Sequence, residues 1–446
     1  MSDLQIYVTL AVFGAVIVSI AFDLIDMAVA ALLGVSVLIG LGLLHEPDLL
    51  EAVKTASGPL SLLFGGMIVA HTLGSAGRFE RIEAMFLRAT RGSGRRFLLL
   101  LVVLVAPVCA LLPNATTVVL LAPVVVRVCR SLQIDFVRPL ILTAIVSNAA
   151  GLLTLVGDPA TFLVGSSIGM SFGRYLQTVS LGGVLSLLII VPLLPLLMPD
   201  LWRLQRVLPP EEPVRPLERP GFAMLALAVL ALMIVLFLVG ESLPTHVVPP
   251  AVAIIAAALS LFVIYRVQIE PVDDVIRDVD WKTLVFLGAI FCLVQAVTNT
   301  GLLQTFSLKL YAWAGTRFTP VAFGLLAGIA VLSSLLANTP VVAASILMIK
   351  GYLVAAEVVP EAALASDFTA WPAATIPVFV AMMFGATLGG NATLIGAAAN
   401  IVAAGVCARN GKPVSFGEWL RYGVPLTIGQ LVVSALYVLG LIFFMR

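Results

Sequence analysis

The stretch SNAAGLLTLVGDPAT, residues 147–161, interrupts an apolar run that extends over residues 137–165. Glycine and proline break helices, and a broken helix inside a bilayer exposes backbone N–H and C=O groups that protein, water or a ligand must satisfy. Small polar side chains and one carboxylate, Asp158, lie at this break. The stretch therefore predicts a discontinuous transmembrane helix with a polar site at its centre.

The composition of the chain is that of a membrane protein. Of 446 residues, 61% are hydrophobic and 11% are charged, whereas soluble domains are about 25% charged. The 25 Lys and Arg balance 24 Asp and Glu, which excludes a basic nucleic-acid binder and an acidic disordered tail. Residues 1–5 carry no Lys or Arg and the first apolar run continues into a second, so no cleavable signal peptide is expected.

Apolar runs long enough to cross a bilayer predict an all-α polytopic protein. They cover residues 5–22, 27–44, 58–76, 137–165, 174–198, 221–240, 247–265, 281–300, 371–406 and 422–445. Two further runs, 97–130 and 318–355, break at Pro113-Asn114 and at Ala337-Asn338. Because each arm is short for a full span, we interpret both runs as re-entrant hairpins. The alternative is a pair of kinked ordinary spans in each run.

The distribution of Lys and Arg favours the hairpin layout. With the N- and C-termini outside, nineteen of the 25 basic residues fall on the inner side, as the positive-inside rule requires. These are Arg78, Arg81, Arg88, Arg91, Arg95, Arg96, Arg127, Arg130, Arg138, Arg203, Arg206, Arg215, Arg219, Arg266, Arg277, Lys282, Arg409, Lys412 and Arg421. The sequence thus predicts a multi-pass protein of the cytoplasmic (cell inner) membrane.

Two polar segments lie between the apolar runs. Residues 199–220 hold six prolines among charges, so they cannot form a helix throughout and are expected to be a cytoplasmic linker between residues 1–198 and 221–446. Residues 79–91 (FERIEAMFLRATR) place Phe79, Ile82 and Phe86 on one face. That pattern is typical of a helix lying along the inner membrane surface.

The two parts resemble each other at their breaks. Leu111–Asn114 matches Leu335–Asn338, and Thr154–Thr161 matches Thr393–Asn400 in the same order. Because each part has an odd number of spans, the second part would have the opposite orientation in the membrane. The sequence therefore predicts two inverted repeats of five transmembrane helices and one re-entrant hairpin each, with residues 1–76 as scaffold helices, which is the architecture of secondary transporters.

There are four breaks in all, namely the two hairpin tips and the glycine-rich stretches 147–159 and 387–397. Their polar side chains are the candidate binding residues, because ligands replace the missing backbone partners there. They are Asn114, Thr116, Thr117, Ser147, Asn148, Thr154, Asn338, Thr339, Thr387, Asn391 and Thr393. Glycines would let the backbone unwind beside them, namely Gly151, Gly157, Gly389, Gly390 and Gly396. Asp158 is the candidate for proton or cation coupling, with capping of the helix that begins at Pro159 as the alternative. His71 is a second titratable candidate, although a hydrogen-bonded structural role suits it better.

These residues carry a family resemblance. Ser147–Gly151 and Thr154–Pro159 resemble the "SNIGG…TLIGDPPN" signature of the ion transporter superfamily, and Leu388–Asn400 resembles its second-half motif. The closest branch is the group of arsenite permeases, NhaD-type antiporters and melanosomal P proteins, which share a citrate-transporter-like domain. The resemblance covers essentially the whole chain, and it implies a scaffold domain and a transport domain, usually in a homodimer.

The hairpin tips depart from part of that group. NhaD-type antiporters and P protein resemble "DNxTT" and "DNxP" at the tips, whereas Pro113 and Ala337 stand at the acidic positions here. The loss of both carboxylates counts against direct sodium/proton exchange. A polar pocket with one nearby acid suits a neutral polyhydroxylated solute such as arsenous, antimonous or silicic acid, and the resemblance to arsenite permeases makes proton-coupled efflux the first hypothesis.

Other functions remain open at this point. A sodium- or proton-coupled carrier of a dicarboxylate, citrate or sulfate, a cation/proton antiporter, and a channel are the alternatives. An enzyme is disfavoured because the sequence has no GxSxG motif, no CxxC pair among its four cysteines and only three histidines. No cofactor or metal is expected. Without a GxxxxGK[ST] motif, the energy source must be a proton or sodium gradient, or a partner ATPase.

Overall fold

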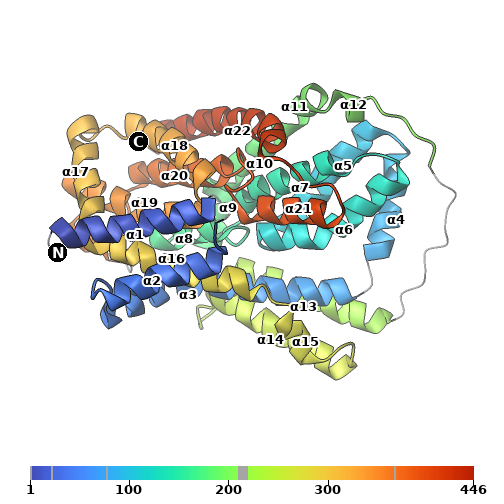
Figure 1. The fold of residues 1–446 in the computed structure, drawn as a ribbon, viewed down its shortest axis with the longest axis horizontal. Coiled ribbons are helices and arrows are strands. Elements are labelled where there is room, and N and C mark those ends of the chain that lie inside the picture. Colours follow the sequence, from blue (N-terminus) through green and yellow to red (C-terminus); the bar gives the residue numbers. More distant parts are fainter. Residues whose placement is uncertain (1–2, 22–23, 77–78, 209–218, 366–367, 446) are drawn as a thin grey trace.

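In the computed structural model the chain is an assembly of helices (Figure 1). The structure describes residues 3–21, 24–76, 79–208, 219–365 and 368–445, and within these ranges no sheet forms. Ten described segments of 18 residues or more are long and apolar enough to cross a membrane. The all-α polytopic fold predicted from composition and hydropathy is therefore confirmed.

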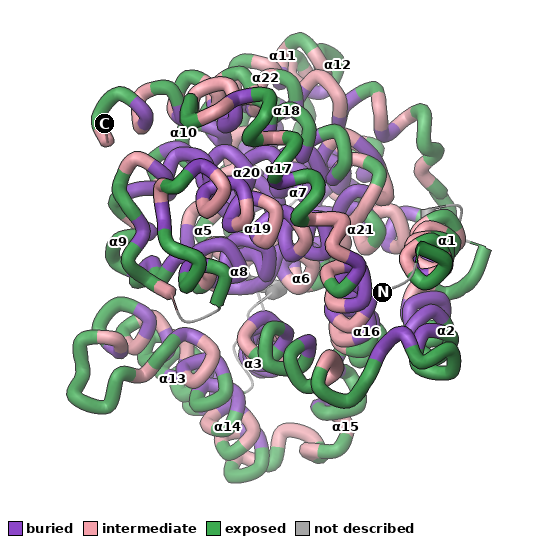
Figure 2. Tube along the Cα trace, turned by 90° about the vertical axis from the view of Figure 1, so that its left-hand side faces the viewer, coloured by how far each residue is buried: buried purple, intermediate pink, exposed green. Residues whose placement is uncertain are grey.

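The helices form two groups, which Figure 2 shows end-on. The scaffold group comprises α1 (Asp3–Ala21), α2 (Met27–Gly40), α3 (Glu46–Ser75), α13 (Pro220–Val239), α14 (Pro249–Val267), α15 (Val272–Arg277) and α16 (Trp281–Asn299). The hairpin group comprises α4 (Phe79–Thr90), α5 (Gly94–Cys109), α6 (Asn114–Ser131), α7 (Val137–Ala150), α8 (Pro159–Ser167), α9 (Phe172–Thr178), α10 (Ser180–Leu188), α11 (Ile190–Leu197), α12 (Pro199–Trp202), α17 (Leu302–Ala314), α18 (Phe318–Leu335), α19 (Asn338–Ala355), α20 (Ile376–Gly389), α21 (Ala398–Arg409) and α22 (Phe416–Phe444). Helices α3 and α16 form the boundary, where they pack against α6, α8 and α19.

Two helical hairpins enter the assembly from opposite ends. Helices α5 and α6 occupy the right-hand part of Figure 1, and α18 and α19 occupy the left-hand part. The arms are 16, 18, 18 and 18 residues long. The three arms of 18 residues are among the ten described segments long and apolar enough to cross a membrane, so their re-entrant placement stays a prediction. Pro113 and Ala337, which precede the second arms, have nearly the same conformation, with φ/ψ of −53°/145° and −57°/140°. The two hairpin tips thus share a local conformation, and the inverted repeat stays a prediction.

Two helices break at the glycine-rich stretches. The first break lies between α7 and α8 and includes a short 3-10 turn, Gly151–Leu153, and the second lies between α20 and α21. Glycine is needed at both, because a Cβ built on Gly157 would lie 3.0 Å from Gly151 Cα and one on Gly396 would lie 2.9 Å from Gly390 Cα. The backbone thus folds closely back on itself at each break.

Some element boundaries differ from those expected. Helix α3 begins at Glu46 rather than near residue 58, because Asp48 accepts a 2.8 Å hydrogen bond from the His45 backbone N–H and caps a polar first turn. The expected span 174–198 is divided into α9, α10 and α11. Pro192 cannot donate to the preceding turn, which explains the interruption before α11.

The linker is not wholly irregular. It starts with one helical turn, α12, whose first residue Pro199 is compatible with that position. Residues 209–218 of the predicted linker lie outside the described residues.

Helix α4 is present where the amphipathic pattern predicts a helix, and it runs across the ends of the other helices at the right of Figure 1. Its Phe86 is buried against Phe97 of α5, with ring centroids 5.7 Å apart. Part of its apolar face therefore covers the first hairpin, and its contact with the membrane surface stays a prediction.

Candidate functional site

The N-termini of four helices meet at one small cavity between the two groups. The cavity has a volume of about 90 Å³, and the residues at the starts of α6, α8, α19 and α21 line one wall. These residues are Asn114, Ala115, Asp158, Pro159, Asn338, Thr339, Pro340 and Ala398. Each helix start carries the positive end of a helix dipole, although the N–H groups of Ala115 and Ala160 are already bound by Asn114 and Asp158. The cavity therefore attracts electron-rich oxygen atoms.

The opposite wall is contributed by the scaffold group and is mainly apolar. It contains Ile17, Ile20, Met27, Leu63, Met67, Phe286, Leu287 and Ile290, with Thr283 as a polar member. A solute in the cavity would therefore make its polar contacts with the hairpin group. Apart from Thr283, the side chains of this wall offer no hydrogen-bonding group to the polar half of the site.

Asp158 is the one ionisable side chain among the described residues that line this cavity. It is 1% exposed and caps α8, since one carboxylate oxygen accepts from the Ala160 backbone N–H at 3.1 Å. Its other oxygen accepts from Asn338 Nδ2 at 2.8 Å. The predicted capping is thus present, and it leaves the second oxygen to join the first break to the tip of the second hairpin.

Thr387 of α20 also faces the Asp158 carboxyl group. This threonine is fully buried, and its hydroxyl makes no hydrogen bond of normal geometry with any described group. A buried hydroxyl without a partner is costly. Because a hydroxyl can donate to a carboxylate or accept from a carboxylic acid, Thr387 suits a neighbour that changes protonation state.

The asparagines at the breaks bind mainly to one another. Asn148 lies at the centre: its Oδ1 accepts from Asn114 Nδ2 at 2.9 Å, and its Nδ2 donates to the Oδ1 atoms of Asn391 and Asn400, both at 2.9 Å. Asn148, Asn391 and Asn400 are fully buried, and Asn114 is 5% exposed. The cluster joins the first hairpin tip and the first break to the second break.

The structure divides the predicted binding residues into two sets. Asn114, Asn338 and Thr339 line the 90 Å³ cavity, and Thr116 lines an adjoining cavity of about 460 Å³. The remaining members, which do not line the small cavity, are Thr117, Ser147, Asn148, Thr154, Thr387, Asn391 and Thr393. This second set is buried behind the cavity wall.

Two threonines of the buried set fasten each break to a hairpin. Thr154 Oγ1 donates to Ala110 O at 2.5 Å, and Thr393 Oγ1 donates to Ser334 O. These are corresponding positions in the two matched motifs. Their side chains hold the backbone of the site rather than facing the cavity.

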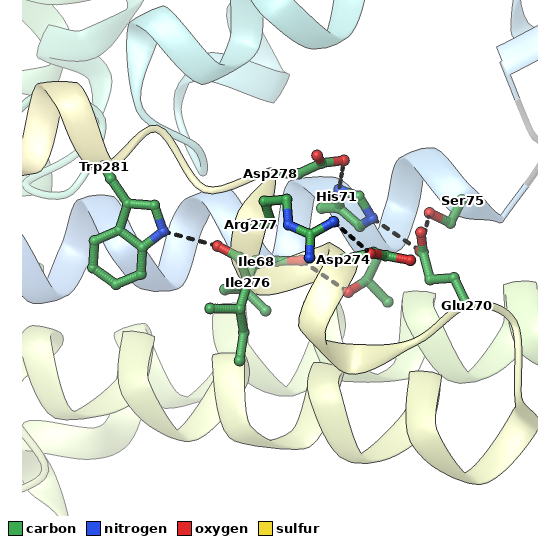
Figure 3. A network of polar contacts seen from close by, with 10 residues as sticks. Ile68, His71, Ser75, Glu270, Asp274, Ile276, Arg277, Asp278 and Trp281 are labelled. Carbon is green, nitrogen blue, oxygen red and sulfur yellow. Dashed lines mark hydrogen bonds and ion pairs between the residues drawn. The ribbon is translucent and has the colours of Figure 1, made fainter.

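His71 belongs to a different polar cluster. Figure 3 shows it between two acids, with Nε2 2.9 Å from Glu270 Oε1 and Nδ1 3.8 Å from Asp278 Oδ2, while Ser75 donates to the same Glu270 oxygen at 2.8 Å. His71 and Asp278 line the 460 Å³ cavity, which shares Met67 and Ala115 with the smaller one. His71 therefore has the hydrogen-bonded structural role that the sequence favours. Its ring does not line the 90 Å³ cavity.

Two polar residues in this region were not singled out from the sequence. Gln430, fully buried in α22, accepts from Asn391 Nδ2 at 3.0 Å, and Asn400 donates to Gly390 O and Thr393 O at 2.8 Å each. An amide inside the predicted span 422–445 was a usable signal for Gln430, because such groups need partners in a membrane. Asn400 is the last residue of the second-half motif, and the motif did not indicate its hydrogen bonds.

The chain is similar to known transporters over almost its whole length. Residues 15–374 match the citrate transporter family, CitMHS. The chain is 37% identical over 443 residues to the uncharacterized transporter slr0753 of Synechocystis sp., covering 99% of each chain, and 26% identical to human P protein, covering 98% of this chain and 60% of that one. The structure resembles that of the YdaH transporter from Alcanivorax borkumensis, with a TM-score of 0.57, 15% identity and coverage of 89% and 87%.

Proposed function

This chain belongs to the CitMHS citrate transporter family and is a secondary transporter of the ion transporter superfamily, and we propose that it exports a small neutral metalloid acid in exchange for protons. Arsenous acid is the first candidate solute, followed by antimonous and silicic acids. The observation that carries this proposal is the 90 Å³ cavity with four helix N-termini and a single carboxyl group.

The size of the cavity favours a very small solute. Its volume of about 90 Å³ is several times smaller than that of the adjoining cavity, about 460 Å³. A compact hydroxy acid built on one central atom is the kind of solute that suits so small a space. Sites for drug-sized molecules typically measure about 300–1,000 Å³.

The charges around the cavity favour a neutral acid that has both hydroxyl hydrogens and oxygen lone pairs. The positive dipole ends of the four helices attract the lone pairs, and the Asp158 carboxylate can accept from a hydroxyl. A second anion about 4 Å from that carboxylate would be repelled by about 4 kcal/mol at an effective dielectric constant near 20. The helix dipoles offset part of this repulsion, and a neutral solute avoids it.

The exchange of solute for protons follows if the solute and a proton compete for the carboxyl group of Asp158. When a solute hydroxyl or Asn338 satisfies the carboxylate, the group stays ionised. When a proton occupies it, the acid hydrogen needs an acceptor, and the unpaired hydroxyl of Thr387 is available for this purpose. Movement of the hairpin group along the apolar wall of the scaffold group would then carry either the solute or the proton across.

The proposal is tested in everted vesicles that contain the protein, under an imposed pH gradient. Saturable accumulation of arsenite or silicic acid, collapsed by an uncoupler and unaffected by sodium, is expected. Vesicles lacking the protein are the control. Transport of citrate or sulfate without the metalloids, or a response to sodium alone, would contradict the proposal and assign one of the other functions of this superfamily.

Thr387→Val is expected to reduce proton-driven accumulation about tenfold, since it removes the hydroxyl that would accept from protonated Asp158, and one such hydrogen bond is worth about 1.5 kcal/mol. Valine has nearly the same shape, so the fold should be retained. The matched control is Ser260→Ala in α14, which removes the other buried hydroxyl that has no partner among the described residues. Equal effects of the two substitutions on accumulation would contradict a specific role for Thr387.

A further inference from the structure

Four buried side-chain amides form a continuous hydrogen-bonded chain, here called the amide chain: Asn114, Asn148, Asn391 and Gln430. Asn114 Nδ2 donates to Asn148, Asn148 Nδ2 donates to Asn391, and Asn391 Nδ2 donates to Gln430 Oε1 at 3.0 Å. Gln430 Nε2 then donates to the backbone oxygen of Ser186 in α10 at 3.2 Å. The amide chain thus runs from the cavity to a wall formed by α22 and α10.

The direction of these hydrogen bonds is determined by backbone groups at the ends. Ser186 O can only accept, so Gln430 must present its NH₂ there and its oxygen to Asn391. At the other end, Asn114 Oδ1 accepts from the Ala115 backbone N–H at 2.8 Å, which leaves its NH₂ for Asn148. Reversing any one amide would therefore place two donors or two acceptors face to face.

Each side-chain nitrogen and oxygen of the amide chain has at least one hydrogen-bond partner, and neighbouring groups add further contacts. Trp419 Nε1 donates to Asn391 O at 3.1 Å and fixes the backbone next to the side-chain amide. Ser186 and Ser434 hydroxyls lie 3.1 Å apart and join α10 to α22 beside Gln430. A buried hydrogen-bonded network of this kind rigidifies the elements that it connects. Asn114, which does line the cavity, is held at the far end of that network.

We propose that Gln430 is a positioning residue for the solute site, and that it acts through Asn391 and Asn148 on the tip of the first hairpin. The claim that Gln430 affects solute binding rests on the proposed function. The claim that Gln430 holds the tip of the first hairpin in place does not. It makes α22 and α10 components of the moving hairpin group rather than passive covering helices. A disturbance at Gln430 should therefore appear at residues 110–117, on a distant segment of the chain.

The test compares Gln430→Met with Ser434→Ala by hydrogen exchange of the full-length protein in detergent, without any solute. Methionine has a similar volume but cannot replace either amide bond. Ser434 lies one turn further along the same buried face, and its substitution leaves every bond of the amide chain intact. Gln430→Met is expected to speed exchange at residues 110–117 about tenfold, with little change in Ser434→Ala. Unchanged exchange at 110–117 in Gln430→Met would overturn the inference.

A second readout uses arsenite as the probe. Gln430→Met is expected to raise the KM for arsenite about tenfold while the maximal rate changes less than twofold, because the site is mispositioned but its coupling group is intact. If the wild-type protein shows no saturable response to arsenite, the proposed function fails and the exchange experiment still decides the role of Gln430.

A further variant, Gln430→Glu, tests the same role. At low pH its carboxyl group is protonated, so it can donate to one partner and accept from the other as glutamine does. Hydrogen exchange at residues 110–117 should then be as slow in this variant as in the wild type at the same pH. Should Gln430→Met fail to fold, fast exchange at low pH in Gln430→Glu would overturn the inference.

Discussion

Asp158→Asn is expected to abolish proton-driven accumulation of the solute while solute-for-solute exchange continues. At one proton per neutral solute, a gradient of about two pH units can support about 100-fold accumulation, since each unit corresponds to 1.36 kcal/mol. The variant should reach no accumulation at all, because an amide cannot carry the proton. The measurement is accumulation of arsenite in everted vesicles against the imposed pH difference, with counterflow of preloaded arsenite in the same vesicles.

The geometry allows this variant to keep its fold. Asparagine retains an oxygen that can cap α8 at Ala160, and the amide of Asn338 can turn to offer its own oxygen to the new NH₂ group. Asp135→Asn is the matched control: it makes the same chemical change in a carboxylate that is paired with Lys412 at 3.3 Å and is 51% exposed. Full proton-driven accumulation in Asp158→Asn would limit Asp158 to its capping role.

Asn148→Ala is expected to have the largest effect on stability. The substitution removes three hydrogen bonds and leaves Asn114 Nδ2 and the Oδ1 atoms of Asn391 and Asn400 without that partner inside the protein. Each buried polar group left unpaired costs about 1–3 kcal/mol, so the free energy of unfolding should fall by about 3 kcal/mol or more. The melting temperature of the purified protein in detergent measures this loss.

The control for Asn148 is Thr143→Val in the same helix. The Thr143 hydroxyl is fully buried but bonds only to Pro139 O within α7, at 2.7 Å. Its removal should cost about 1 kcal/mol or less. Equal melting temperatures for Asn148→Ala and Thr143→Val would show that the asparagine cluster contributes no more than an ordinary helix-internal bond.

Much of the fold could be predicted because the bilayer imposes strict rules on the sequence. A backbone in hydrocarbon must satisfy its own hydrogen bonds, so long apolar runs indicate helices and polar glycine-rich interruptions indicate places where helices stop. This reasoning located the turns at Pro113 and Ala337 and the breaks before Asp158 and Ala397. It failed for the start of α3 and for α9–α11, where local capping and Pro192 decided the boundaries.

The candidate site could be predicted less completely. The residue types at the breaks indicate polar contacts, but they do not say whether an amide faces a solute or another amide. Asn114 and Asn338 line the cavity, whereas Asn148 and Asn391 bind to other side chains behind it. His71 satisfied the same rule for intramembrane ionisable groups as Asp158, yet it pairs with Glu270 outside the small cavity.

The sequence by itself determined the class of protein and the positions at which helices are interrupted, because these depend on local hydropathy and on residues that cannot continue a helix. Only the tertiary structure decided which interruptions meet, that four helix N-termini share one cavity of about 90 Å³, and that Gln430 and Asn148 complete the network behind it. Such pairings join residues as much as 252 positions apart. They depend on how whole helices pack, and no local pattern contains that information.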